Sequence, residues 1–361
     1  MSKGQIRLII QPDDGATPLV QGIDGAKESL DILIFRFNRR ELENALVRAV
    51  QRGVRVRALI AHLSSGGEKA LRSLEMRLLK AGVTVARTAG DLVRYHGKMM
   101  IIDQSELYLL GFNFTYIDMD RSRSFGVILK DRKLVEEATK LFEADSTRQE
   151  YTPGDPRFVV SPLNARESLL EFLKGASKEL LIYDPNLGDP TFVGVLDERA
   201  KAGVTIRILG SSTRMSVRKL TGQRLHVRAI VRDETSFFLG SQSFRATELD
   251  KRREIGVILE DPSIAAAIKE IFEKDWKASQ PAPGTADVFI PAAKIAKKVA
   301  KAVTSGLPPL SPMLQGAVKE VAGSEVSLPL NSDELQETVK DAVKQAVKDA
   351  VREAVEEAGP A

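Results

Sequence analysis

Two short runs of the chain place residues that could do chemistry at the same spacing. HGKMMIID at 96–103 and HVRAIVRD at 226–233 each begin with a histidine, followed by a cation two positions on and an aspartate five positions further. The chain has three histidines, and these runs hold two of them. An imidazole with a pKa of about 6.5 can act as a nucleophile or as a proton donor near neutrality. The spacing therefore predicts one site built from two imidazoles and two cations.

A phosphodiester is a substrate that such a site could cleave. One imidazole would attack phosphorus while the other, protonated, would donate a proton to the departing alkoxide. The cations would hold the non-bridging oxygens and offset their developing charge. Residues two apart on a β-strand share a face, so we expect His96 with Lys98, and His226 with Arg228, to project together toward one phosphate. No metal or cofactor is needed, because three histidines without clustered carboxylates make a poor metal-ligand set.

The repeat extends beyond these runs. FGVILKD at 125–131 matches IGVILED at 255–261, with the same 130-residue offset that separates the two histidines. GVRVRALI at 53–60 resembles GVTIRILG at 203–210 with an offset of 150, so the first half has about twenty extra residues before its histidine. A duplicated unit with one insertion explains both offsets.

Short β-rich runs alternate with segments of helical period in both halves. In the first half, strands are predicted at 6–10, 30–35 and 54–60, and helices at 41–52 and 68–81. In the second half, strands are predicted at 158–161, 179–183 and 204–209, and helices at 166–176 and 192–202. The pattern predicts an α/β fold of two pseudo-symmetric lobes, each a mixed sheet flanked by helices, at 1–150 and 151–280. A linker and a helical tail are expected at 281–361.

Composition places few limits on function. Hydrophobic residues make up 43% and charged residues 28% of the 361 residues, as in ordinary globular proteins. The formal charge of +4 hints only weakly at anionic partners. There is no cysteine, which excludes disulfides and thiolate metal sites. We find no apolar stretch of membrane-spanning length and no signal-peptide pattern, so a cytoplasmic protein, at most peripheral at a membrane, is expected.

Two segments of the tail have their own patterns. The segment 292–303 places four lysines opposite Ile295, Val299 and Val303, which is typical of a helix lying on an anionic membrane. A solvated or self-associating helix is the alternative. The segment 332–358 repeats valine every four residues, a broad apolar surface suited to self-association or to packing on the body of the protein.

The paired motifs resemble those of the phospholipase D superfamily, HxKxxxxD followed by a GSxN-like turn. GSQS at 240–243 fits that turn with Ser243 in the asparagine position, and LGFN at 110–113 keeps Asn113 but lacks the serine that the second turn has at Ser241. The stretch around the second motif looks like that of bacterial cardiolipin synthase and phospholipase D relatives. The resemblance covers roughly residues 5–278.

The resemblance implies two lobes whose histidines meet between them, and a covalent phosphohistidine released by water or an alcohol. It implies His96 as nucleophile and His226 as general acid. It also implies that Asn113, Ser241 and Ser243 bind substrate.

In the superfamily a carboxylate downstream of each motif often orients the histidine. The matching positions are Ser124 and Glu254, each 28 residues past its own histidine. We therefore expect Glu254 to be a catalytic residue that favours the protonated form of His226, and Ser124 to give His96 weaker support.

The two aspartates of the motifs, Asp103 and Asp233, have a different expected role. Each lies five residues after its cation, so it would face away from the site on a regular strand. We expect both to pair with backbone amides or arginines rather than to carry protons.

The function favoured by the sequence is cleavage or exchange of a phospholipid headgroup, with a phospholipid or another phosphodiester as the substrate. The rivals are a metal-independent nuclease of the same superfamily, which would need a basic groove that follows several phosphates, and a non-catalytic phosphate or membrane binder in which the second motif has decayed.

Overall fold

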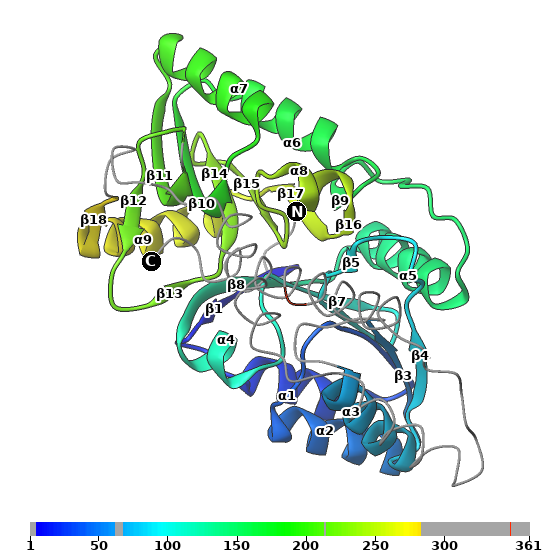
Figure 1. The fold of residues 1–361 in the computed structure, drawn as a ribbon. Coiled ribbons are helices and arrows are strands. Elements are labelled where there is room, and N and C mark those ends of the chain that lie inside the picture. Colours follow the sequence, from blue (N-terminus) through cyan, green and yellow to red (C-terminus); the bar gives the residue numbers. More distant parts are fainter. Residues whose placement is uncertain (1–4, 62–67, 213, 283–346, 348–361) are drawn as a thin grey trace, which may run out of the picture. The chain divides into compact units, whose positions relative to one another are not determined.

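The computed structural model describes residues 5–61, 68–212, 214–282 and 347. Contacts divide the chain into Met1–Gly284 and Thr285–Ala361, and every helix and strand named below lies in the first unit (Figure 1). The two predicted tail helices at 292–303 and 332–358 lie outside the described residues, apart from Val347.

The first lobe contains a mixed sheet in which four antiparallel pairings are followed by two parallel ones. Its main path is β1 (Ile6–Gln11), β8 (Ser122–Leu129), β7 (Glu106–Leu110), β6 (Met99–Ile102), β2 (Ser29–Ile34), β3 (Arg55–Ile60) and β4 (Thr84–Arg87). The pairs from β1 to β2 are antiparallel, and β2, β3 and β4 are parallel.

The second lobe repeats this order. Its sheet runs β9 (Phe158–Val160), β17 (Ile255–Glu260), β15 (Ser236–Gly240), β14 (Arg228–Arg232), β10 (Glu179–Leu187), β11 (Thr205–Ser212), β12 (Arg218–Leu220) and β18 (Ser279–Pro281). The first seven strands match those of the first lobe in order and in direction. The predicted fold class, two mixed sheets flanked by helices, is confirmed.

The helices lie in three layers (Figure 1). Outer layers cover one face of each sheet, and a central layer shares one apolar cluster with the inner faces of both sheets. The outer helices are α1 (Thr17–Gly25), α2 (Arg40–Gln51) and α3 (Glu68–Lys80) on the first sheet, and α6 (Ala165–Lys174) and α7 (Pro190–Lys201) on the second. The central helices are α5 (Arg132–Thr147) and α9 (Pro262–Ala278).

Strand periodicity explains how one sheet serves two apolar layers. In β6, Met99 and Ile101 join the central cluster, whereas Met100 and Ile102 pack under the outer helices. Successive side chains of a strand point to opposite faces, so a strand buried on both faces has no polar alternation.

The twenty-residue insertion predicted from the repeat corresponds to α3 and its connections. In the first lobe α3 separates β3 from β4, whereas in the second lobe only residues 213–217 join β11 to β12. The insertion thus adds one outer helix and leaves the strand order unchanged.

The lobes exchange short strands at their junction. β5 (Arg94–Tyr95) of the first lobe pairs in parallel with β16 (Arg252–Arg253) of the second, and β13 (Arg224–Leu225) pairs in parallel with β8 of the first. The two exchanges are equivalent in the repeat: β13 lies 130 residues after β5, and β16 lies 130 residues after the part of β8 that pairs with β13. The residue that follows β5 is His96 and the residue that follows β13 is His226, so both histidines lie at the junction.

Two buried ion pairs cross the junction at related positions. Arg123 Nε lies 3.0 Å from Asp275 Oδ2, and Arg253 Nη2 lies 3.1 Å from Asp145 Oδ1. The same two arginines also hold the histidine backbones, because the Arg253 carbonyl accepts from His96 N at 2.8 Å and the Arg123 carbonyl accepts from His226 N at 3.0 Å.

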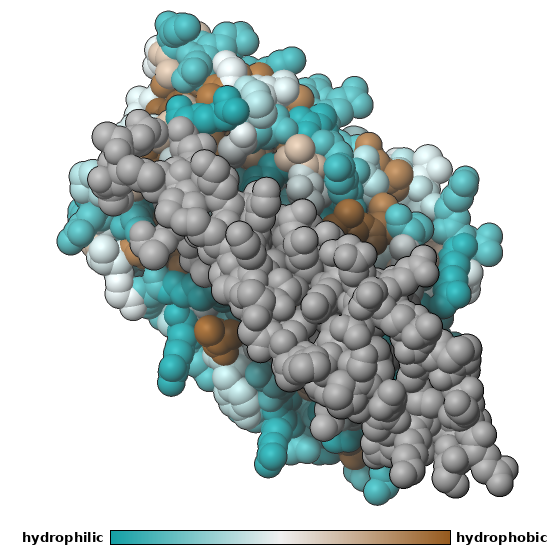
Figure 2. All heavy atoms as spheres, in the orientation of Figure 1, coloured by the Kyte–Doolittle hydropathy of each residue, from teal (hydrophilic) through white to brown (hydrophobic). Residues whose placement is uncertain are grey.

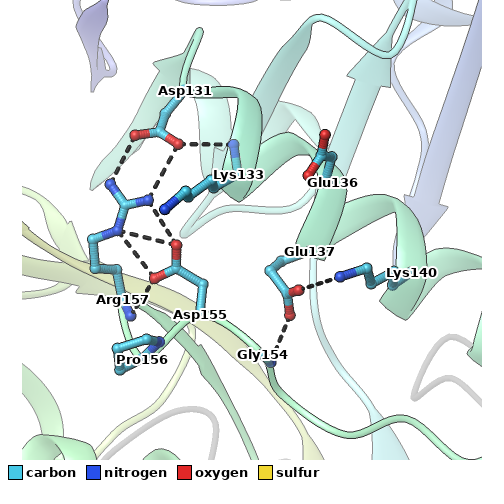
Figure 3. Close-up of a pocket in the computed structure, with 9 residues that line it drawn as sticks. All are labelled: Asp131, Lys133, Glu136, Glu137, Lys140, Gly154, Asp155, Pro156 and Arg157. Carbon is cyan, nitrogen blue, oxygen red and sulfur yellow. Dashed lines mark hydrogen bonds and ion pairs between the residues drawn. The ribbon is translucent and has the colours of Figure 1, made fainter.

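A hollow of about 760 Å³ lies beside the connection between the lobes (Figure 3). Several of its lining residues are bonded to one another: Arg157 donates to Asp131 and Asp155, each at 2.7 Å, and Glu137 accepts from Gly154 N at 2.8 Å. No motif residue lines it. These contacts hold the connection around 154–157 against the N-terminal part of α5.

The visible surface is mainly hydrophilic, with small separate apolar areas, one of them over α4 (Tyr116–Asp120) (Figure 2). Within the described ranges, no helix is both long and apolar enough to cross a membrane.

Candidate active site

The first motif begins in the link between β5 and β6. His96, Gly97 and Lys98 lie outside any strand, so the expectation that His96 lies on a regular strand is wrong. The backbone leaves the sheet here because both His96 N and Gly97 N donate to the carbonyl of Arg253 in the other lobe. The expected pairing of side chains nevertheless occurs, since Lys98 Nζ lies 2.9 Å from His96 Nε2.

Both ring nitrogens of His96 have partners. Nδ1 lies 2.9 Å from Glu254 Oε2; when Glu254 is ionised its carboxylate can only accept, and Nδ1 then carries the proton. Burial lowers the pKa of His96 well below its usual value, and the charges of Lys98 and Arg252 lower it further. The result is a neutral imidazole with a lone pair on Nε2, the protonation state that a nucleophile needs.

Glu254 has a different partner from the one that the sequence predicts. We expected Glu254 to support His226, its own motif's histidine, and that prediction is wrong because its hydrogen bond is to His96. The reason is the strand exchange. β16 pairs with β5, so the residue after β16 lies beside the residue after β5. Burial raises the pKa of Glu254, and the charge of Lys98 opposes this rise.

Lys98 is a fully buried cation. Its Nζ donates to the His96 carbonyl at 2.6 Å and lies 5.5 Å from the centre of the Phe35 ring. Burial lowers the pKa of Lys98 to about 7, against the opposing charge of Glu254. A lysine whose pKa lies near 7 becomes fully protonated when an anion binds beside it, because the anion raises that pKa.

His226 also lies outside any strand, because β14 begins at Arg228, so the expected regular strand is wrong for the second motif too. Its side-chain contacts differ from those of the first motif. Arg228 Nη1 donates to the His226 carbonyl at 3.0 Å, as Lys98 does in the first motif, and Arg228 Nε donates to Ser243 Oγ at 3.1 Å. His226 Nδ1 is buried without a hydrogen bond, and so is Ser124 Oγ, the position that matches Glu254. Here no carboxylate is bonded to the imidazole.

The turns after the motifs are anchored by carboxylates that the sequence reading did not single out. Asp118 Oδ2 accepts from Asn113 N at 2.9 Å and from Asn113 Nδ2 at 2.6 Å, and Glu248 Oε2 accepts from Ser243 N at 2.7 Å. Ser241 Oγ accepts from Ile255 N at 3.1 Å. Asp118 and Glu248 have the 130-residue offset of the motifs, and that signal could have identified them.

We call His96 with Lys98 the first half-site and His226 with Arg228 the second half-site. The cation of each half-site acts electrostatically on the histidine of the other. The charge of Arg228 helps to lower the pKa of His96, and the charge of Lys98 helps to lower that of His226, although burial is the main cause in both cases. The turns also approach closely, because a Cβ added to Gly111 would lie 3.2 Å from the Gly240 carbonyl oxygen.

Asp103 and Asp233 have the backbone partners that the sequence predicts. Asp103 accepts from three successive amides at 27–29, and Asp233 from the amides at 177–179. Each follows its motif strand in a turn with positive φ, 50° and 53° respectively. Both carboxylates stabilise a loop and do not contact the histidines in these hydrogen bonds.

In the part of the chain that the structure describes, no group of three histidine or carboxylate side chains could hold a metal ion.

A family model described as "Cardiolipin synthase, PLD-like domain" matches residues 19–146 and 211–276, more than half of the chain. The chain therefore belongs to this family, within the phospholipase D-like superfamily of phosphodiesterases and phospholipid-modifying enzymes. The matched residues include both motifs.

Individual relatives agree with this family. The chain is 29% identical over 137 residues to a phospholipase D of Rickettsia prowazekii, a match that covers 38% of this chain and 65% of the relative. It is 30% identical over 145 residues to the mitochondrial cardiolipin hydrolase of Mus musculus, covering 38% and 63% respectively. The chain thus spans less than two thirds of the length of these relatives.

A solved structure shares the fold over nearly the whole chain. The phosphatidylserine synthase of Haemophilus influenzae matches with a TM-score of 0.63 at 10% identity, over 94% of this chain and 96% of that one.

Proposed function

We propose that this protein cleaves or exchanges the headgroup of a phospholipid through a covalent phosphohistidine on His96. The observation that carries the proposal is the environment of His96: Nδ1 bonded to Glu254 and Nε2 beside Lys98. A carboxylate on Nδ1 fixes the tautomer and stabilises positive charge as the imidazole reacts. A cation beside Nε2 marks where a phosphate oxygen would sit.

The reaction has two displacements at phosphorus. His96 Nε2 forms a bond to phosphorus while the bond from phosphorus to the headgroup oxygen breaks. His226, which becomes protonated when the anionic phosphodiester binds beside it, donates its proton to that oxygen. His226, now neutral, then takes a proton from water or an alcohol, whose oxygen attacks phosphorus and breaks the bond to Nε2. Lys98 and Arg228 hold the non-bridging oxygens through both steps, and Asn113, Ser241 and Ser243, on the turns after the motifs, bind the substrate.

A phospholipid is the preferred substrate because the family model and the relatives are named for cardiolipin and phospholipid chemistry. A nuclease is the second candidate. Arg94, Arg224 and Arg252 act on the histidines electrostatically, and such a concentration of cations also suits a polyanion.

One set of incubations separates these candidates. The purified full chain is incubated with phosphatidylglycerol or phosphatidylethanolamine vesicles and, in parallel, with single- and double-stranded DNA, with EDTA throughout. His96→Ala and His226→Ala serve as controls for contaminating activity. Headgroup release or exchange that both controls lack is the expected result. DNA cleavage without lipid turnover would favour the nuclease, and turnover of neither would favour a binding protein.

A further inference from the structure

The two histidines differ in their carboxylate partners. Glu254 is bonded to His96, but the matching position on the other side is Ser124, whose hydroxyl has no hydrogen bond. His226 Nδ1 also lacks a hydrogen bond. A general acid that must hold a positive charge in a buried site needs a compensating negative charge nearby.

Asp118 brings such a charge to His226 from a different element. Its Oδ2 lies 3.9 Å from His226 Nδ1, too far for a hydrogen bond but within the range of an ion pair. Asp118 is the third residue of α4, follows the N-cap Thr115, and is 2% exposed. It lies outside the motif positions and six residues before Ser124.

The Asp118 carboxylate is held in place on both oxygens. Oδ1 accepts from Arg224 Nη1 at 2.6 Å, and Oδ2 accepts from the backbone and side chain of Asn113. Burial raises the pKa of Asp118, but the charges of His226 and Arg224 and the bonds from Asn113 outweigh burial and hold that pKa well below its usual range. Asp118 is therefore ionised whenever the site is at neutral pH.

The charged groups that act on His226 come from α4, β13, β14 and the link between β5 and β6. Burial is the largest cause that lowers the pKa of His226, the charge of Asp118 raises it, and Arg228, Arg224 and Lys98 lower it. Asp118 is thus the one carboxylate among these charged groups, which belong to the described part of the chain.

We infer that Asp118 replaces the missing carboxylate at position 124 and acts as the positioning residue and counter-charge for the imidazolium of His226. This assignment rests on the proposed function, since it concerns the proton donor for the departing headgroup. It also gives each imidazole its own carboxylate, supplied by unrelated positions of the duplicated fold.

Glu248 is a matched control. It lies at the position equivalent to Asp118 and accepts from the backbone amide of Ser243, as Asp118 does from Asn113. Its other contact is with Arg252 at 3.7 Å, and the histidine on its side already has Glu254. Both carboxylates support a turn and both act electrostatically on Lys98, so Glu248→Gln reproduces these two effects. Only Asp118→Asn also removes the negative charge that acts on His226.

The first readout is the dependence on leaving group. A phospholipid with an alkyl headgroup needs a proton at the departing oxygen, whereas a p-nitrophenyl phosphodiester does not. Asp118→Asn is expected to lower kcat on the phospholipid about 10- to 100-fold and on the aryl substrate less than about 3-fold. Glu248→Gln is expected to change kcat on the two substrates by the same factor, because it removes no charge that acts on His226. Equal losses on both substrates, or equal effects of the two variants, would overturn the assignment.

The second readout does not need activity. The chain has three histidines, so their imidazole ¹⁵N signals can be assigned in the full chain with single His→Gln variants. The pKa of His226 is expected to be lower in Asp118→Asn than in wild type and unchanged in Glu248→Gln. An unchanged His226 in Asp118→Asn would refute the assignment even if turnover falls. An inactive wild type would instead refute the proposed function, while the titration would still decide the role of Asp118.

If Asp118→Asn does not fold, the charge-retaining pair Asp118→Glu and Glu248→Asp gives the same comparison. Asp118→Glu moves the carboxylate relative to His226 and is expected to shift the titration of that imidazole, whereas Glu248→Asp is not. If the pKa of His226 is the same in Asp118→Glu as in wild type, the assignment is contradicted.

Discussion

The two half-sites have the same backbone plan but different side-chain chemistry. In both, the histidine follows a two-residue strand that pairs with the other lobe, and the cation donates to the carbonyl of its own histidine. The His96 ring is bonded on both nitrogens, whereas His226 Nδ1 has no hydrogen bond. A duplicated motif can therefore supply two unlike imidazoles, which is what a nucleophile and a proton donor require.

The largest expected effect is the loss of either imidazole. His96→Ala and His226→Ala are each expected to lower headgroup release from phospholipid by about 10⁴-fold or more, because each removes the nucleophile or the proton donor. The effects of two residues that act as one unit are not additive. The double variant should be no slower than either single variant. Initial rates on vesicles measure this, and a single variant with wild-type activity would show that the two motifs do not form one site.

The carboxylate of the first half-site gives the next largest effect. Glu254→Gln removes the charge that orients His96 Nδ1 and is expected to lower kcat about 100-fold. Ser124→Ala, at the equivalent position, is expected to change kcat less than about 3-fold because the Ser124 hydroxyl makes no hydrogen bond. Similar losses in both variants would contradict the asymmetry.

The cations should differ in their pH dependence. The pKa of Lys98 is lowered to about 7 in the folded protein, so in the free enzyme its charge is present below pH 7 and is lost as pH rises through that value. We expect kcat/KM to fall above about pH 7 as phosphate binding weakens. In Lys98→Arg the fall of kcat/KM should begin at a higher pH, because a guanidinium stays charged. If kcat/KM falls at the same pH in Lys98→Arg as in wild type, another group causes the fall.

The smallest expected effect is on stability, at the two ion pairs across the junction. Asp275 accepts from Arg123 Nε at 3.0 Å and from Tyr183 Oη at 2.7 Å, whereas Asp145 Oδ2 has no partner. Asp275→Asn should lower the free energy of unfolding by about 3 kcal/mol. Asp145→Asn should change it by less than about 1 kcal/mol.

The pH dependence of stability separates these aspartates further. Burial raises the pKa of Asp145 to about 6, although Arg253 opposes the rise. The folded protein then binds more protons at this carboxyl than the unfolded chain does, so its contribution to stability falls as pH rises from about 4 to 6. Denaturant titrations of Asp145→Asn should lack this decline, and a decline equal to that of wild type would assign it elsewhere.

Much of the fold follows from local patterns. The predicted helix at 41–52 is α2 at Arg40–Gln51, and the predicted strand at 30–35 is β2 at Ser29–Ile34. These elements were predictable because a sheet buried under helices produces short β-rich runs between segments of helical period. The internal repeat further predicted two equivalent lobes and an insertion of about twenty residues before His96, which in the structure contains α3.

The site was only partly predictable. The motif spacing identified His96 and Lys98, whose side chains do meet, because that contact is local in sequence. The partner of Glu254 was not predictable in the same way, because the strand exchange joins β5 to β16 across 158 residues of sequence. The 130-residue offset between Asp118 and Glu248 marks both as part of the repeat, but Asp118 belongs to no motif position, and its approach to His226 depends on the junction between the lobes.

The central claim is that His96 forms a bond to phosphorus. Rapid acid-free quenching of the full chain with a ³²P-labelled phospholipid, followed by peptide mapping, tests it directly, because a phosphoramidate on histidine survives alkali and is lost in acid. Label on the peptide that contains His96, absent in His96→Ala, is the predicted result. Label on the peptide that contains His226, or turnover without any labelled intermediate, would contradict the account.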